Sequence, residues 1–112
     1  MPNQPAQLTR VFQALADPTR RAVLQRLSGG TAAVSELAKP FDMALPSFLQ
    51  HLKVLEGSGL VRSRKSGRVR TYQISPQPLK AAEGWIVGRR ALWERRLDQL
   101  DQYLDSLEAK KS

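Results

Sequence analysis

The residues "LPSFLQHLKVLEGSGLVRSRKSGRVRTYQI" (45–74) change their hydrophobic period part-way along, and this change decides the fold. Four apolar residues in the first half keep the spacing of one face of an α-helix: Leu45, Phe48, Leu52 and Leu55. Gly57 and Gly59 then end the helical pattern. Two β-prone runs follow around Ser66-Gly67, which favours a β-hairpin with a two-residue turn. The stretch therefore predicts a helix followed directly by a hairpin.

The predicted hairpin is strongly basic. It carries a cluster of cationic residues, namely Arg62, Arg64, Lys65, Arg68 and Arg70. With Ser66-Gly67 as the turn, Val61 is expected opposite Tyr72, and Ser63 opposite Arg70. Val61, Tyr72 and Ile74 would then face the core, and Arg64, Lys65 and Arg68 would lie at the tip.

Shorter helical patterns precede this stretch. Residues 8–16 place Leu8, Val11, Phe12 and Leu15 on one face of a helix. A second helix is expected to begin at Pro18, with Asp17 as its N-cap. Residues 34–38 predict a third, short helix that ends before Pro40. A short helix, a turn and the helix at 45–56 form a helix-turn-helix pattern. A basic hairpin directly after that pattern is typical of a wing.

The last segment, residues 78–108, predicts a long helix with one apolar stripe. Ile86, Trp93, Leu97, Leu100, Leu104 and Leu107 follow an a/d heptad spacing. A helix of about 30 residues would be ~45 Å long, longer than a domain of this size needs. We therefore expect segments 8–16 and 78–108 to form a dimer interface, although the long helix could instead fold back on its own domain. The expected dimer residues are Leu8, Phe12, Trp85, Ile86, Leu92, Trp93, Leu97, Leu100 and Leu104.

Length and composition limit the classes of function. The chain has 112 residues, which suits a single domain, and a net charge of +8, which favours a polyanionic partner such as DNA, RNA or an anionic membrane surface. It has no cysteine, which excludes disulfides and thiolate metal sites. It has no apolar run of membrane-spanning length, and its first residues do not resemble a signal peptide. We therefore expect a cytoplasmic protein.

A helical projection of residues 45–57 identifies the candidate reading residues. Gln50 points almost directly away from the apolar face, and Ser47 and Lys53 also point outward. A glutamine amide can bind adenine N6 and N7 together in the major groove, while serine and lysine can bind phosphates. His51 lies on the flank, where it could donate to a phosphate or pack against a neighbouring helix. The five cations of the hairpin would bind phosphates or the minor groove, and Arg62 could instead pair with a carboxylate.

Enzymatic and metal-binding functions fit the sequence poorly. His51 is the single histidine, so it has neither a cysteine nor a second histidine as partner. The sequence contains no nucleophile elbow and no glycine-rich phosphate loop. We therefore predict no catalytic residues, no metal site and no cofactor.

Several motifs together resemble the ArsR-type winged-helix repressors of bacteria and archaea. They are the opening "ALADPTRRAVL" (14–24), the helix end "HLKVLE" (51–56) with "GLV" (59–61), and the wing residues around Gly67, Arg68 and Tyr72. The resemblance covers about residues 8–107. It implies a homodimer joined by the first and last helices, a recognition helix at about 45–56 in the major groove, and repression by blocking a promoter.

The sequence departs from this family pattern in two places. The positions that match the family's metal-binding cysteines look like Ala33 and Ser35, and the last helix has no histidine, so the resemblance implies the branch that senses no metal. In the recognition helix, Ala44 and Leu49 stand where family members often have polar residues. Leu49 could touch a thymine methyl group or simply pack. The sequence does not indicate an inducer.

The predicted fold is mainly α with a β-hairpin wing, a winged helix-turn-helix of order α-α-α-α-β-β-α that ends in a long helix. The predicted function is a homodimeric, sequence-specific DNA-binding transcriptional regulator, a repressor that acts on an inverted repeat. Two alternatives remain open at this point. One is a basic module that binds nucleic acid without sequence preference, and the other is a module whose long helix docks a protein partner.

Overall fold

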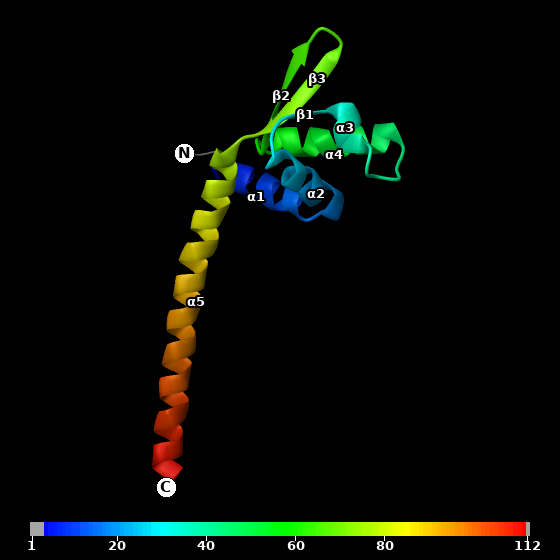
Figure 1. Cartoon of the computed structure of the whole chain (residues 1–112). Helices are drawn as coiled ribbons and strands as arrows, with labels where there is room; N and C mark the ends of the chain where they lie inside the picture. Colours follow the sequence, from blue (N-terminus) through cyan, green and yellow to red (C-terminus); the bar gives the residue numbers. More distant parts are fainter. Residues whose placement is uncertain (1–3, 112) are drawn as a thin grey trace. The chain divides into compact units, whose positions relative to one another are not determined.

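The computed structural model describes residues 4–111 and contains the predicted elements in the predicted order, with one additional strand. The helices are α1 (Gln4–Leu15), α2 (Pro18–Leu27), α3 (Val34–Ala38), α4 (Leu45–Gly57) and α5 (Pro76–Lys111). The strands are β1 (Ala32–Ala33), β2 (Val61–Ser66) and β3 (Val69–Ile74). Figure 1 shows the hairpin of β2 and β3 above α4, with its loop pointing away from the helices of this part of the chain. The chain divides into two compact units, one ending at Ala82 and the other beginning at Glu83.

The core of the first unit gathers one face from each of helices α1 to α4. Its most deeply buried large side chains are Phe48, Leu37, Leu52, Leu55, Leu60, Val11, Val23 and Val61. The ring of Phe41 lies 5.4 Å from that of Phe48, measured between centroids, and closes the core beside α4. Leu45 was predicted on the same stripe as Phe48, but its side chain is 53% exposed. The buried face of α4 therefore starts at Phe48.

The first turn of α2 explains how two helices meet at Asp17. The Asp17 carboxylate accepts a hydrogen bond from the backbone N–H of Arg20 at 3.1 Å, as an N-cap does, and Pro18 follows directly. The guanidinium of Arg20 donates to the backbone oxygens of Ala14 (2.9 Å) and Gln13 (2.8 Å). Arg21 donates to the Leu15 oxygen at 2.7 Å. These three carbonyls belong to the last turn of α1, so the arginines of α2 satisfy acceptors that the end of a helix leaves without a partner.

The sheet corrects the predicted register of the hairpin. Val61 pairs with Ile74, Ser63 with Tyr72 and Lys65 with Arg70, so the predicted pairs Val61–Tyr72 and Ser63–Arg70 are wrong. The turn residues are Gly67 and Arg68 instead of Ser66 and Gly67, because Ser66 pairs with Val69. Gly67 has φ +62°, which is the conformation that a type II′ turn requires at its first central position. Val61 and Tyr72 are buried and Ile74 is half-buried, as expected.

Strand β1 was not predicted from the sequence. Ala32 pairs with Tyr72 and Ala33 with Thr71, which makes β3 the central strand of an antiparallel sheet of order β1-β3-β2. A strand of two alanines is too short to show an alternating pattern. It secures the hairpin on the side opposite β2, directly before α3.

The second unit is the continuation of helix α5, which is 36 residues long and begins at Pro76, two residues before the predicted start. Large apolar side chains are exposed along it: Trp85, Ile86, Val87, Trp93, Leu97, Leu100, Tyr103, Leu104 and Leu107. Leu92 is half-buried. Arg90 and Glu94 form an ion pair of 3.0 Å one turn apart. No helix within residues 4–111 is long and apolar enough to cross a membrane.

Gly59 lies in the turn between α4 and β2, and replacing it tests how closely this turn packs against α1 and the start of α5. It has φ +83°, and a Cβ atom there would lie 3.1 Å from Nε2 of Gln7 and 3.3 Å from Cγ of Pro78. Gly59→Ala is therefore expected to lower the free energy of unfolding by about 1–2 kcal/mol. Gly57→Ala is the control, since a Cβ atom at Gly57 meets nothing within 4 Å. It should leave stability unchanged or raise it by up to about 1 kcal/mol in urea unfolding. Equal stability of the two variants would contradict this account of the α4–β2 turn.

Candidate nucleic-acid interface

Helix α4 buries one face and exposes the face on which the sequence placed the reading residues. Phe48, Leu52 and Leu55 are fully buried, whereas Ser47, Gln50 and Lys53 are exposed. Gln50 lies about 160–170° around the helix from the direction of its buried side chains, because successive residues turn by ~100°. The structure therefore brings Ser47, Gln50 and Lys53 together on one exposed surface.

The first turn of α4 has no side-chain cap. Ala44 is the N-cap residue and makes no side-chain hydrogen bond to the first turn, and no acidic residue lies in that turn. Pro46 has no backbone N–H, so it removes one of the donors that a helix start leaves without a partner. The remaining donors point out of a helix end whose dipole is positive. This end of α4 is therefore electrostatically compatible with phosphate.

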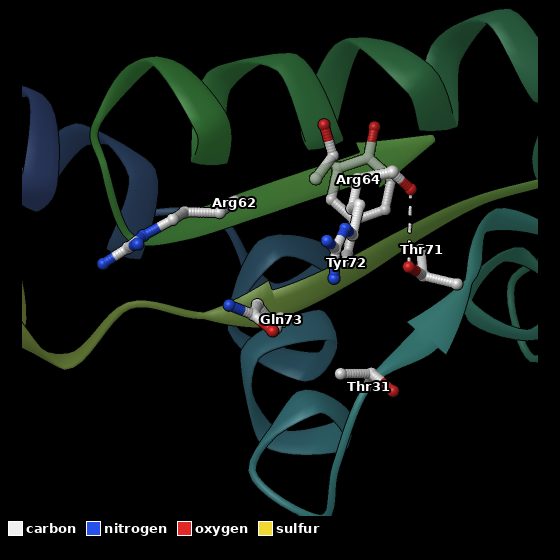
Figure 2. Close-up of a pocket in the computed structure, with 7 residues that line it drawn as sticks. Thr31, Arg62, Arg64, Thr71, Tyr72 and Gln73 are labelled. Atoms are coloured by element: carbon white, nitrogen blue, oxygen red, sulfur yellow. Dashed lines mark hydrogen bonds between the residues drawn. The ribbon is translucent and has the colours of Figure 1, made fainter. Parts of the chain in front are cut away.

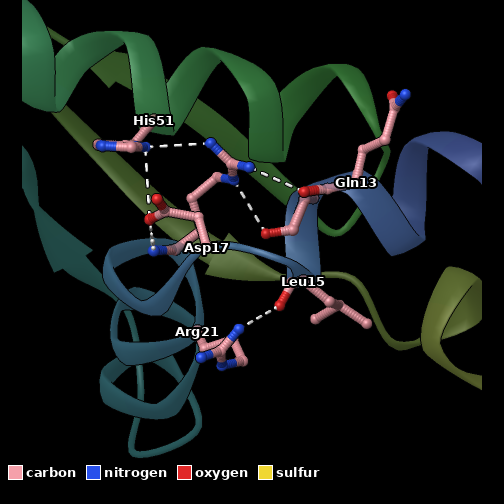
Figure 3. A network of polar contacts seen from close by, with 7 residues as sticks. Gln13, Leu15, Asp17, Arg21 and His51 are labelled. Atoms are coloured by element: carbon pink, nitrogen blue, oxygen red, sulfur yellow. Dashed lines mark hydrogen bonds and ion pairs between the residues drawn. The ribbon is translucent and has the colours of Figure 1, made fainter.

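His51 lies in a polar network rather than in the exposed face (Figure 3). Its Nδ1 atom is 3.1 Å from a guanidinium nitrogen of Arg20 and 3.7 Å from the Asp17 carboxylate. A guanidinium can only donate, so Nδ1 accepts this hydrogen bond and the ring proton is on Nε2. Of the two roles expected for His51, the structure therefore shows packing against a neighbouring helix, here α2. In this tautomer the Nε2–H group can still donate a hydrogen bond.

This network joins three helices. Arg20 lies in α2, binds carbonyls at the end of α1 and reaches His51 on α4. Sequence reasoning missed Arg20, although one signal was present. Two arginines in the first turn of a helix oppose the helix dipole, so they need another reason to be there. Their hydrogen bonds to the last turn of α1 supply that reason.

The cations of the hairpin are exposed, but they do not share one face. Residues that pair across an antiparallel ladder point to the same side of a sheet. Lys65 and Arg70 therefore share the side of Tyr72, Arg62 and Arg64 point to the opposite side, and Arg68 lies in the turn. The expected grouping of Arg64, Lys65 and Arg68 at the tip is correct for their position along the hairpin, but Arg64 and Lys65 point to opposite faces.

Two cations of the hairpin are held by neighbouring hydroxyl groups. Arg70 donates to Oγ of Ser63 at 2.7 Å, and that hydroxyl donates to the Glu56 carboxylate at 3.0 Å. This chain ties the hairpin to the last turn of α4. Arg62 donates to Oγ of the buried Ser75 at 3.3 Å, so its partner here is a hydroxyl group rather than a carboxylate. Burial raises the pKa of Tyr72, and the Glu56 carboxylate raises it further.

The outer face of the sheet forms a polar hollow of about 480 Å³. It is lined by Thr31, Arg62, Ser63, Arg64, Thr71, Tyr72 and Gln73. Figure 2 shows Gln73 on β3 and Thr31 directly before β1, both below Arg64, and Arg62 extending away from them. Its lining contains no carboxylate, so the hollow extends the positive surface of the wing.

Comparison with known proteins gives the family. A model described as a helix-turn-helix domain matches residues 15–64. The HTH-type transcriptional regulator Rv2034 of Mycobacterium tuberculosis is 42% identical over 97 residues, which cover 87% of this chain and 88% of that protein. The transcriptional repressor SdpR of Bacillus subtilis is 29% identical over 80 residues, covering 71% of this chain and 89% of the repressor.

Solved structures agree. The crystal structure of an ArsR family transcriptional regulator has a TM-score of 0.77 and 62% sequence identity, and the match covers 80% of this chain and 93% of that one. The chain belongs to the ArsR family. A homodimeric winged helix-turn-helix DNA-binding domain of Mycobacterium bovis, solved by NMR, has a TM-score of 0.60 and 30% identity, covering 78% of this chain and 82% of that one.

Membership of the ArsR family confirms several expectations. The chain is a DNA-binding transcriptional regulator and not an enzyme, and its fold is the winged helix-turn-helix.

The position of Asp17 gives a test by pH. Partial burial raises the pKa of this carboxyl, but the backbone N–H of Arg20 and the nearby positive charge of the Arg20 side chain outweigh it and hold the pKa below its usual value. A lowered pKa in the folded state stabilises the protein above the unfolded value of ~3.9, and this contribution is lost as the pH falls through the folded pKa.

Asp17→Asn keeps a capping oxygen but removes the charge. The variant is expected to be less stable than the parent at pH 7, and the difference should shrink below about pH 4 and vanish near pH 2. Urea unfolding at pH 7, 4 and 2 measures it. Asp42→Asn, at an exposed aspartate in the turn before α4, is the control. A deficit of Asp17→Asn that stays constant down to pH 2 would show that the charge contributes nothing.

Proposed function

We propose that the protein is a homodimeric, cytoplasmic repressor that binds an inverted-repeat operator through α4 and the β2–β3 wing. The observation that carries this proposal is the position of Gln50, which is exposed opposite the buried face of the second helix of a helix-turn-helix. In such motifs that helix enters the major groove, and its N-terminal residues contact base edges. Bound at a promoter, such a dimer would block transcription, and SdpR is a relative that is a repressor.

The four polar residues of α4 have separate roles in this proposal. Gln50 hydrogen-bonds an adenine through its N6 and N7 atoms. Ser47, in the first turn, binds a phosphate or a base edge, and Lys53 binds a phosphate. His51 donates to a phosphate from Nε2, since Nδ1 is the acceptor of Arg20. Arg20 thereby sets the tautomer of a residue that contacts DNA in this proposal.

The wing supplies cations that bind the DNA backbone without reading sequence. Arg68 in the turn, with Arg64 and Lys65 beside it, contacts phosphates or the minor groove. Arg62 and Arg70 carry hydrogen bonds to serine hydroxyls, which limit where their charges can lie. We infer that these two residues support the wing and contribute charge, while the other three make its outermost contacts.

In this proposal the whole chain, residues 1–112, is a single DNA-binding domain. Its helices α1 and α5 form the dimer interface. The predicted segment 78–108 falls inside α5, and the predicted segment 8–16 extends one residue beyond the end of α1 at Leu15. The stripe of α5 leaves several leucines and aromatic residues in solvent, more than a monomeric protein commonly exposes on one helix face. Leu8 and Phe12 of α1 are half-buried against the core of their own unit, so only part of each is available to a partner. A related winged helix-turn-helix domain is a homodimer.

Metal sensing is not part of the proposal. Ala33 and Ser35, at the positions that match the family's cysteines, cannot supply thiolates. No described residue identifies an inducer.

Replacing Gln50 tests the reading role. Gln50→Ala should weaken binding to the preferred operator by about 1–3 kcal/mol and relax the preference at one base pair, because a bidentate contact to adenine is lost. Gln25→Ala, at an exposed glutamine of α2, is the matched control and should bind as the parent does. Arg68→Ala should weaken binding to all sequences alike and lower the slope of log K against log salt by about one. Fluorescence anisotropy on operator and random DNA measures all three variants. Equal losses of Gln50→Ala on both DNAs would remove its reading role.

The dimer is tested on the stripe of α5. The double variant Leu97→Glu, Leu100→Glu should sediment as a monomer at micromolar concentration, because four carboxylates would have to be buried in one interface. The double variant Gln99→Glu, Gln102→Glu adds the same charge at positions off the stripe and should remain a dimer. Analytical ultracentrifugation of the parent and both variants decides the outcome. A monomeric parent, or equal dissociation of both variants, would contradict a dimer interface at this stripe.

A further inference from the structure

Two leucines of α4 are exposed at the end of the helix that is proposed to enter the groove. The side chain of Leu45 is 53% exposed and that of Leu49 is 41% exposed. They are four residues apart on one helix, so they lie next to each other on its surface, one turn apart. Together they make an apolar strip on the first two turns of α4.

The strip is not part of the core. The buried face of α4 is formed by Phe48, Leu52 and Leu55, with 1%, 1% and 0% exposure. Single exposed apolar residues need no explanation on a protein surface. Two exposed leucines on adjacent turns of α4 do need an explanation, because the neighbouring face carries Gln50 and the N-terminal end of such a helix contacts base edges.

The chemistry of the major groove offers one apolar partner. Of the groups that base pairs expose there, the C5-methyl group of thymine is apolar, and the others are hydrogen-bond donors or acceptors. Leucine has no polar atom and cannot bind a phosphate. An A·T pair presents the adenine atoms that a glutamine amide binds, and the thymine methyl group lies on the same groove edge. A strip of leucine beside a glutamine is therefore complementary to A·T pairs.

We infer that Leu45 and Leu49 contact thymine methyl groups, so that each half-site contains thymines next to the base pair read by Gln50. This inference rests on the proposed function, because it requires α4 to lie in the major groove. It assigns base specificity to two uncharged residues in addition to Gln50. The occupant of the strip is thus DNA, and a docked protein or a second copy of the chain would give a different result below.

The test begins with the operator that a random-sequence selection returns for the full chain. Each thymine of a half-site is then replaced by deoxyuridine, which removes only the methyl group and keeps the base pairing. Loss of a contacted methyl group should weaken binding of the parent protein by about threefold to fivefold, the fold-change that corresponds to ~0.8 kcal/mol per buried methylene-sized group.

The same scan is run on variants. With Leu49→Ala or Leu45→Ala, the thymine and deoxyuridine operators should bind equally at the position that the lost side chain contacted. Leu49→Gln is a second replacement with a good helix former, in case the alanine variant unfolds. Val54→Ala is the matched control, because Val54 is 38% exposed on the same helix but lies beside Arg10 and Gln13 of α1. It should keep the full sensitivity of the parent protein to deoxyuridine.

The outcomes separate this inference from the proposed function. Sensitivity that is lost in the leucine variants and kept in Val54→Ala supports it. An operator that shows no deoxyuridine effect at any position, or an effect that persists in all leucine variants, overturns it while sequence-specific binding stands. A selection that returns no preferred sequence overturns the proposed function and this inference together.

Discussion

The one-sided burial of α4 is the constraint on which the rest of the structure depends. Phe48, Leu52 and Leu55 are fixed in the core, and these three positions set the rotation of the helix about its axis. Once that rotation is set, Gln50 must point outward and His51 must lie on the flank. A shift of the helix by one residue would turn it by ~100° and move Gln50 from the outward face to the flank. The residues that are proposed to read DNA are thus oriented by residues of the core.

The flank of α4 is held by a polar network, and this has a consequence for rigidity. Arg20 connects the end of α1 with His51 on α4, while Asp17 caps α2 and lies within reach of the same ring. A core of leucines tolerates small rotations of a helix, whereas hydrogen bonds with defined distances do not. The hydrophobic contacts therefore hold α4 in its place in the core, and the polar network in addition fixes its rotation about the helix axis. On the other flank, Glu56, Ser63 and Arg70 do the same between α4 and the hairpin.

The sequence predicted the features that follow from periodicity and capping. The helix bounds around Asp17 and Pro18, the short α3, the recognition helix and the wing were all found where the patterns placed them. The features it missed depend on side chains that meet in space. Arg20 and His51 are 31 positions apart, and no local pattern links them. The turn of the hairpin was misplaced by one residue, because both Ser66-Gly67 and Gly67-Arg68 contain the glycine that such a turn needs.

Charge and specificity are divided between different parts of the domain. The net charge of +8 attracts any nucleic acid, so it cannot by itself select an operator. Selection requires contacts whose energy differs between base pairs, and we propose that in this domain those contacts come from uncharged side chains on α4. In that proposal Gln50 supplies hydrogen bonds, and Leu45 and Leu49, which are exposed, supply apolar surface. Binding through the wing weakens as salt rises, whereas an apolar contact with a methyl group does not depend on counterion release. Because the wing contributes alike to specific and non-specific complexes, both affinities should fall as the ionic strength rises, while the part of their ratio that comes from Leu45 and Leu49 should stay constant.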